Sequence, residues 1–284
     1  MVKYNHNTGR KPPPVYPMEE IMKLCFSTLG CTDRDPDGII ATAHAFHIPY
    51  LEIRGMSGIL DNREIPAFAP ATLPATRERF RAARLQVQVI GTSASFHDPA
   101  MRETSLAEAR AAVNLAAALD APYIRVFGNN TGDAPAEAIR SVTEGLRLLC
   151  DDAAARGVVA LLETHGDFRD ESTLLPILDA LGDHPGFGLI WDVMHTYFTT
   201  GRDFLPLYRL LRPCIRHLHF KDCTPQREQV LPGRGDIPLT DILRQLQKDG
   251  FDGCISLEWE RKWHPELPPI EEALTAMLGI VRHI

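Results

Sequence analysis

Short apolar segments alternate with segments of helical periodicity along almost the whole chain, and this alternation limits the fold more than any other feature. The apolar segments begin near residues 24, 49, 85, 122, 158, 188, 215 and 254. Apolar strands that are covered on both faces are typical of a parallel sheet between helices. Eight such units in about 250 residues have the size of a (β/α)₈ TIM barrel. We therefore predict one α/β barrel domain over residues 21–284.

An open, doubly wound sheet is the alternative fold for this pattern. Such a sheet normally carries a glycine-rich phosphate-binding turn after its first strand. The sequence after the first predicted strand, Leu24–Cys31, is not such a turn, and the Gly-x-Gly segment at Gly233 lies near the end of the chain. These observations favour the barrel.

The termini, the cysteines and the charge balance limit the class of protein. Residues 1–20 are polar and rich in proline, which predicts a flexible arm without the apolar core of a signal peptide. The six cysteines show no CxxC pair, and no apolar run approaches the length of a membrane span. With 37 acidic and 30 basic residues, the chain has a net charge of -7. We expect a reduced, cytoplasmic protein with neither nucleic-acid nor membrane partners.

Ionisable residues gather where the predicted strands end, which in a (β/α)₈ barrel is the rim of the active site. A carboxylate at the end of an apolar strand is costly unless something compensates its charge, and one shared divalent cation would do so. Carboxylates with one imidazole suit Mn²⁺, Mg²⁺ or Co²⁺ better than a structural Zn²⁺ site. The candidates are Glu52, Arg54, Arg125, Glu163, His165, Asp192, His195, His217, His219, Lys221, Asp222, Glu258 and Glu260.

Two pairs of candidates leave the choice of ligand open. His217 and His219 are two residues apart, so their side chains project from the same strand face at different depths. The same spacing relates Glu258 and Glu260. His219 is favoured over His217 because it lies nearer the carboxyl end of its strand.

The order of these residues resembles the sugar phosphate isomerase/epimerase family, which has a xylose-isomerase-like barrel. Members of that family include tagatose and psicose epimerases, inosose dehydratases, hydroxypyruvate isomerases and endonuclease IV. The resemblance runs from about residue 24 to residue 284. It rests on Glu163, Asp192-x-x-His195, His217-x-His219-x-Lys221-Asp222, the Gly-x-Gly-Asp sequence ending at Asp236, and Ser256-Leu-Glu258.

The resemblance implies a single divalent metal ion, with Mn²⁺ as the first expectation and Mg²⁺, Co²⁺ or Zn²⁺ as alternatives. It implies that Glu163 and Glu258 act as acid and base on opposite faces of a substrate carbon, and that His195 holds the substrate. The expected metal ligands are Glu163, Asp192, His219 and Glu258, and further substrate contacts are expected from Lys221, Arg234, Glu52, Arg54, Arg125 and Glu260.

Ion pairs are the structural alternative for several of these charged residues. Lys221 would then pair with its neighbour Asp222, and the charged residues Glu52, Arg54 and Arg125 would form charge pairs inside the barrel mouth.

An isomerase or epimerase acting on a ketose, polyol or sugar-derived keto compound fits this site best. A carboxylate would remove the proton next to a carbonyl, and the metal would stabilise the enediolate that develops. Return of the proton to the other face of the same carbon gives epimerisation, and return to the neighbouring carbon gives isomerisation. If a β-hydroxyl leaves instead, the enzyme is a dehydratase, which is the alternative function. The expected partner is a small sugar-like substrate, and a homo-oligomer is compatible with the sequence.

Two other functions are less favoured. An endonuclease IV-like enzyme would need three zinc ions, and the second and third strand ends offer only His97 as an extra ligand. A non-catalytic barrel would usually lose an acid/base carboxylate, whereas Glu163 and Glu258 are both present.

Overall fold

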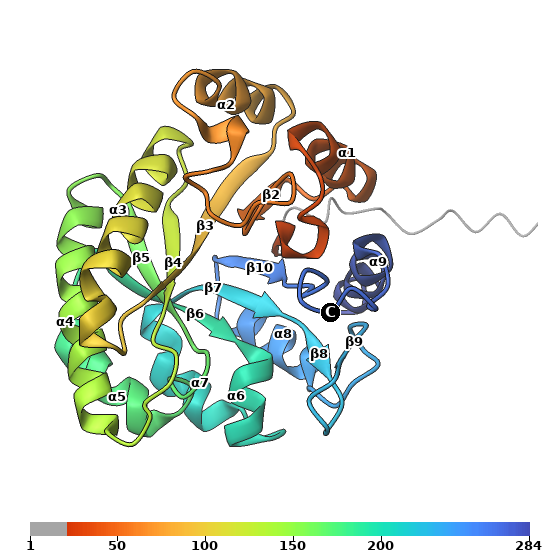
Figure 1. The fold of residues 1–284 in the computed structure, drawn as a ribbon. Helices are drawn as coiled ribbons and strands as arrows, with labels where there is room; N and C mark the ends of the chain where they lie inside the picture. The colour runs from red at the N-terminus through yellow and green to blue at the C-terminus, as the bar shows by residue number, and fades with distance from the viewer. Residues whose placement is uncertain (1–21) are drawn as a thin grey trace, which may run out of the picture.

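Eight parallel strands close into a barrel in the computed structural model, which describes residues 22–284 (Figure 1). The ring order is β1-β10-β7-β6-β5-β4-β3-β2, so the first and last barrel strands pair with each other. The predicted barrel is confirmed, and the predicted arm over residues 1–20 lies outside the described residues. The barrel strands are β1 (Lys23–Ser27), β2 (Tyr50–Ile53), β3 (Gln86–Ser95), β4 (Tyr123–Phe127), β5 (Val159–Glu163), β6 (Phe187–Asp192), β7 (Ile215–Phe220) and β10 (Cys254–Leu257).

Helices surround the barrel, and their ends follow signals in the sequence (Figure 1). The first helix begins at Pro36 because Asp35 accepts a hydrogen bond from the amide of Gly38. The helices are α1 (Pro36–Phe46), α2 (Leu73–Ala82), α3 (Arg102–Ala118), α4 (Pro135–Ala154), α5 (Glu171–Leu181), α6 (Val193–Thr200), α7 (Leu205–Leu211), α8 (Leu239–Lys248) and α9 (Ile270–Val281), with 3₁₀ turns η2 (Thr28–Cys31), η3 (Pro66–Phe68), η4 (Pro99–Met101) and η5 (Arg212–Cys214).

The interior of the barrel is layered, because alternate residues of each strand point inward. One layer is apolar: Val89, Leu161 and Ile190 are buried together, with Tyr123 and Val159 against them. The next inward positions toward the carboxyl ends are polar or empty. They include Gly91 on β3, Arg125 on β4, Glu163 on β5 and Asp192 on β6.

The structure corrects the predicted elements at the mouth of the barrel. The predicted strand Leu24–Cys31 ends at Ser27 and continues as η2, where the Thr28 hydroxyl donates to the carbonyl of Gly55 and accepts from the amide of Arg54. His195 lies in the first turn of α6. This helix follows β6 directly because Asp192 Oδ1 accepts hydrogen bonds from the amides of Met194 and His195.

The seventh and eighth strands of the barrel, β7 and β10, end next to residues of the mouth. The seventh ends at Phe220, and a small hairpin of β8 (Asp222–Cys223) and β9 (Gln229–Val230) begins the loop that follows it. The eighth ends at Leu257, so Glu258 lies just beyond its carboxyl end.

All six cysteines are free and buried. Across residues 22–284, the structure contains no helix with the length and apolar character of a membrane span.

Candidate metal centre

Four ionisable side chains from adjacent strands meet inside the mouth of the barrel. They are Glu163 at the end of β5, Asp192 at the end of β6, His219 on β7 and Glu258 after β10. Nδ1 of His219 lies 3.2 Å from Glu163 Oε1, 3.2 Å from Glu258 Oε2 and 3.7 Å from Asp192 Oδ2. One potential ligand atom of each residue lies within 4.8 Å of those of the other three, and all four residues are buried. We call this group the metal quartet.

Unsatisfied oxygen atoms in the metal quartet fit a bound cation. Glu163 Oε2 and Asp192 Oδ2 are buried and have no well-aligned hydrogen-bond donor among residues 22–284. Burial opposes ionisation of Glu258, but His219 and Lys221 outweigh it and hold the pKa of this carboxyl group well below its usual range. These two oxygens have ion-pair contacts with Arg125 and Lys221 but no hydrogen bond. Three carboxylates and one imidazole that meet at one point match the donors that a divalent cation such as Mn²⁺ prefers.

In a second group, formed by Glu52, His217 and His219, both oxygens of the Glu52 carboxylate have hydrogen-bond partners, whereas Nδ1 of His217 has none among residues 22–284. The Glu52 carboxylate lies 3.0 Å from His217 Nε2, 3.2 Å from His219 Nε2 and 2.9 Å from the donating hydroxyl of Ser256. Each Glu52 oxygen thus has a hydrogen-bond partner, whereas Glu163 Oε2 and Asp192 Oδ2 of the metal quartet have only ion-pair contacts among residues 22–284. The structure thus places His219 in the metal quartet and His217 beneath it, against Glu52 alone.

Lys221 neutralises two carboxylates of the metal quartet and the neighbouring carboxylate of Glu260. Its Nζ atom lies 2.6 Å from Glu258 Oε2, 2.6 Å from Glu260 Oε1 and 2.8 Å from Asp192 Oδ2. Burial lowers the pKa of this ammonium, but the three carboxylates outweigh it and raise the pKa well above its usual value. The alternative that Lys221 pairs with Asp222 is wrong.

Asp222 instead fixes the loop that follows β8. Its carboxylate accepts hydrogen bonds from four backbone amides, those of Cys223, Gly233, Gly235 and Ile237. Arg234, in the same loop, is exposed, and its side chain forms no hydrogen bond or ion pair with residues 22–284. The structure therefore does not bring Arg234 to the metal quartet.

Two arginines lie on the side of the mouth formed by β2, β3 and β4. Arg125 Nε is 3.3 Å from Glu163 Oε2, its Nη1 donates to the carbonyl of Thr92, and its guanidinium lies over the ring of Phe127. The expected charge pairs in the mouth thus include this one. Arg54 has no carboxylate partner in the described part of the chain, and its Nη2 donates to the hydroxyl of Ser93.

Two histidine rings pack together next to these groups. The rings of His165 and His195 have centroids 4.2 Å apart, and His165 also packs against Phe127. Burial lowers the pKa of His195 to about 4, so its imidazole is neutral at physiological pH. His165, a predicted candidate at the end of the fifth strand, thus lies beside the predicted substrate residue His195, two residues beyond the end of β5.

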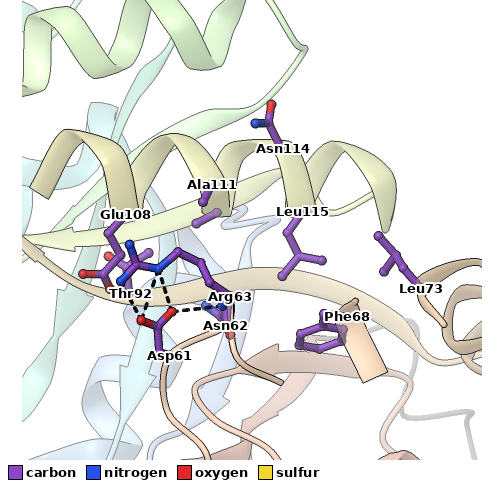
Figure 2. Close-up of a pocket in the computed structure, with 11 residues that line it drawn as sticks. Asp61, Asn62, Arg63, Phe68, Leu73, Thr92, Glu108, Ala111, Asn114 and Leu115 are labelled. Atoms are coloured by element: carbon purple, nitrogen blue, oxygen red, sulfur yellow. Dashed lines mark hydrogen bonds and ion pairs between the residues drawn. The ribbon is translucent and has the colours of Figure 1, made fainter. Parts of the chain in front are cut away.

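A cavity of about 240 Å³ lies elsewhere, between α3 and the loop that joins β2 to α2 (Figure 2). An ion pair between Asp61 and Arg63 stands at one end, and Phe68 and Leu73 lie at the other. None of the predicted site residues lines this cavity. The predicted metal ligands meet inside the barrel instead.

Comparison with known proteins gives a family and several similar folds. A family model described as a xylose isomerase-like TIM barrel matches residues 49–279. The chain is 32% identical over 103 residues to a 3-dehydroshikimate dehydratase of Bacillus anthracis, which is 35% of this chain and 36% of that protein. The matched segments span only about a third of the first curated relatives.

Two solved structures show the same fold at low identity. The crystal structure of an IolI protein with a bound zinc atom gives a TM-score of 0.76 at 20% identity, covering 92% of this chain and 98% of the other. A D-tagatose 3-epimerase-like protein gives 0.73 at 20% identity, covering 92% and 99%.

Proposed function

Because the chain belongs to the xylose isomerase-like TIM barrel family, we propose that it is a divalent-metal-dependent isomerase or epimerase. It would move a proton next to the carbonyl of a ketose, polyol or sugar-derived keto compound. One observation carries the proposal: Glu163 and Glu258, from strands that two others separate in the ring, both lie 3.2 Å from the same atom, Nδ1 of His219. Two buried carboxylates converging on one point suit proton transfer on either side of a substrate carbon.

Glu163, Asp192, His219 and Glu258 would hold the ion, with Mn²⁺ as the first expectation. When bound, the ion supplies Lewis acidity that makes the hydrogen next to a coordinated carbonyl easier to remove.

The residues around the two glutamates keep them ready to accept a proton. Arg125 lies 3.3 Å from Glu163, and Lys221 lies 2.6 Å from Glu258, so each carboxylate has its own cation. Because all four side chains are buried, competing exchange with bulk water is restricted. In this proposal one glutamate enters the step ionised and takes a proton from the substrate carbon, and the other enters it protonated and donates its own proton to the opposite face.

Neighbouring polar groups would orient the substrate. The neutral imidazole of His195 would share a hydrogen bond with a substrate hydroxyl. The other proposed substrate contacts at this mouth come from Lys221, Glu260 and Arg125.

A dehydratase is the second candidate, favoured by the 32% identity over 103 residues to the 3-dehydroshikimate dehydratase. The same glutamate would remove a proton, and a hydroxyl on the next carbon would leave. The ammonium of Lys221, beside Glu258, would donate a hydrogen bond to the departing hydroxyl.

Solvent-deuterium exchange tests the proposal. The protein would be loaded with Mn²⁺ and incubated in D₂O with a panel of ketoses, inososes and 2-keto acids. We expect carbon-bound deuterium next to the carbonyl. Apart from this label, the mass of the product should equal that of the substrate for an isomerase or epimerase. For a dehydratase, it should be lower by one water. Glu163→Gln and Glu258→Gln should each slow exchange by at least ~10²-fold at saturating Mn²⁺.

Glu228→Gln is the matched control, because this glutamate is exposed in the hairpin loop near the mouth. It should exchange like the wild type. Wild-type rates in both Glu163→Gln and Glu258→Gln would refute the acid/base roles. Protein that binds one metal ion and exchanges no compound of the panel would also count against the proposal.

A further inference from the structure

Arg54 is a buried cation of the barrel mouth that lacks a counter-ion. Arg54 is the residue directly after β2, and it is only 5% exposed. Nη2 donates to the Ser93 hydroxyl at 3.0 Å, whereas Nη1 is buried and has no hydrogen-bond partner among residues 22–284. The other two buried cations of the mouth differ, since Arg125 and Lys221 each contact a carboxylate.

The acids around Arg54 are engaged elsewhere. Glu163 contacts Arg125 and His219, and Glu258 contacts His219 and Lys221. Glu108, on α3, accepts a hydrogen bond from the amide of Ser93 at 2.6 Å. Arg54 therefore stands beside several acids but in contact with none of them.

The missing side chain of Gly91 makes room for this arrangement. A Cβ atom at Gly91 would lie 2.8 Å from Cδ of Arg54 and 3.1 Å from Nη2 of Arg125. The side chains of both arginines thus lie against one glycine on the inner face of β3. Burial and the neighbouring Arg125 lower the pKa of Arg54 to about 10, so it is still charged at physiological pH.

A buried, unpaired charge is costly, and proteins usually pair it or solvate it. A water molecule would satisfy Nη1 but would not balance the charge. A purely structural arginine would be expected to reach one of the acids named above. An anion supplied by a ligand would provide both the hydrogen bonds and the charge that the protein leaves out.

We infer that Arg54 binds a carboxylate of the substrate, so that the substrate is a sugar-derived acid rather than a neutral sugar. This inference rests on the proposed function, whose substrate it narrows. Both anions can pair with a guanidinium through two oxygens, but a carboxylate carries the single negative charge that one unpaired guanidinium balances. A phosphate dianion would also need more free donors than the single orphaned Nη1.

Calorimetric titration of the Mn²⁺-loaded full chain tests the inference. The three probes share a polyhydroxylated ketone and differ in charge: D-fructose, 2-keto-D-gluconate and D-fructose 6-phosphate. We expect wild-type protein to bind the 2-keto acid at least tenfold more tightly than fructose. Arg54→Met should reduce the ratio of the two affinities at least tenfold.

Arg63→Met is the matched control, because Arg63 is exposed on the loop after β2 and pairs with Asp61. It should bind all three probes like the wild type. Equal or undetectable wild-type binding of the acid and the neutral ketose would overturn the inference. A preference for the phosphorylated ketose over the 2-keto acid would overturn the choice of a carboxylate.

Thermal melting without ligand gives an independent readout. If Arg54 is unpaired, Arg54→Met should melt at the same temperature as the wild type or higher, because a buried charge has been removed. A melting temperature clearly below that of Arg63→Met would show a structural partner and overturn the inference. If the protein does not bind metal, only the proposed function is refuted. The inference can still be tested, because Arg54-dependent binding of the 2-keto acid can be measured in metal-free protein.

Discussion

Glu52 lies on the opposite side of the His219 ring from the metal quartet carboxylates, with both of its oxygens 3.2 Å from Nε2. Nδ1 of the same ring faces Glu163 and Glu258. A donor hydrogen on Nε2 would fix the ring orientation and leave Nδ1 free as a ligand, as carboxylates do behind metal-bound histidines. The sequence analysis expected Glu52 at the substrate, but its carboxylate is occupied by protein groups and the residue is completely buried.

Glu52→Gln should therefore weaken metal binding. We expect the Kd for Mn²⁺ to rise by roughly 10–100-fold, because an uncharged amide polarises the imidazole less than a carboxylate does. Electron paramagnetic resonance titration of free Mn²⁺ measures this directly. Ser256→Ala, which removes another hydrogen bond to Glu52 without touching His219, serves as the control and should change the Kd much less. Equal Kd values for Glu52→Gln and wild type would contradict the positioning role.

Lys221→Met should destabilise the metal-free protein. The change leaves the carboxylates of Asp192, Glu258 and Glu260 without the ammonium that contacts all three. Removing one partner of a buried ionic group costs about 3–5 kcal/mol of unfolding free energy. Urea unfolding measures the loss, and Mn²⁺ should restore more stability to the variant than to the wild type. The exposed Lys248→Met should leave the urea midpoint unchanged, and an unaltered midpoint in Lys221→Met would refute the argument.

Asp222→Ala should release the loop between β8 and α8. The carboxylate accepts hydrogen bonds from three backbone amides of this loop and from the amide of Cys223 in β8, and each lost hydrogen bond costs about 0.5–1.5 kcal/mol. Trypsin should then cut at Arg227 and Arg234 at least tenfold faster, which mass spectrometry of the fragments will show. Asp241→Ala, an exposed aspartate on α8, provides the comparison. Cleavage of both variants at the wild-type rate would mean that other contacts hold the loop.

The barrel and its polar mouth could be predicted from the sequence because both follow from local patterns. Each strand is a short apolar run, and a closed parallel barrel brings all carboxyl ends to one face. Glu163, Asp192, His219 and Glu258 therefore converge once the strand order is known. Their roles toward metal and substrate stay predictions.

Contacts that depend on strand pairing could not be predicted in this way. Lys221 and Asp222 are neighbours in sequence, but successive residues point to opposite faces. The register between β7 and β10 pairs Phe220 with Leu257 and so brings Lys221 beside Glu258. The N-cap role of Asp192 could not be predicted from the sequence either, because it depends on a helix that starts directly after β6.

The position of Gly91 has a consequence for sorting related sequences by specificity. Any larger residue there would collide with Arg54 or Arg125, since even a methyl carbon would approach Arg54 Cδ to 2.8 Å. A relative that keeps both arginines but carries alanine or valine at this point must hold at least one guanidinium differently. A glycine at this position is therefore the feature to compare across such chains. A search limited to reactive residues would not detect it.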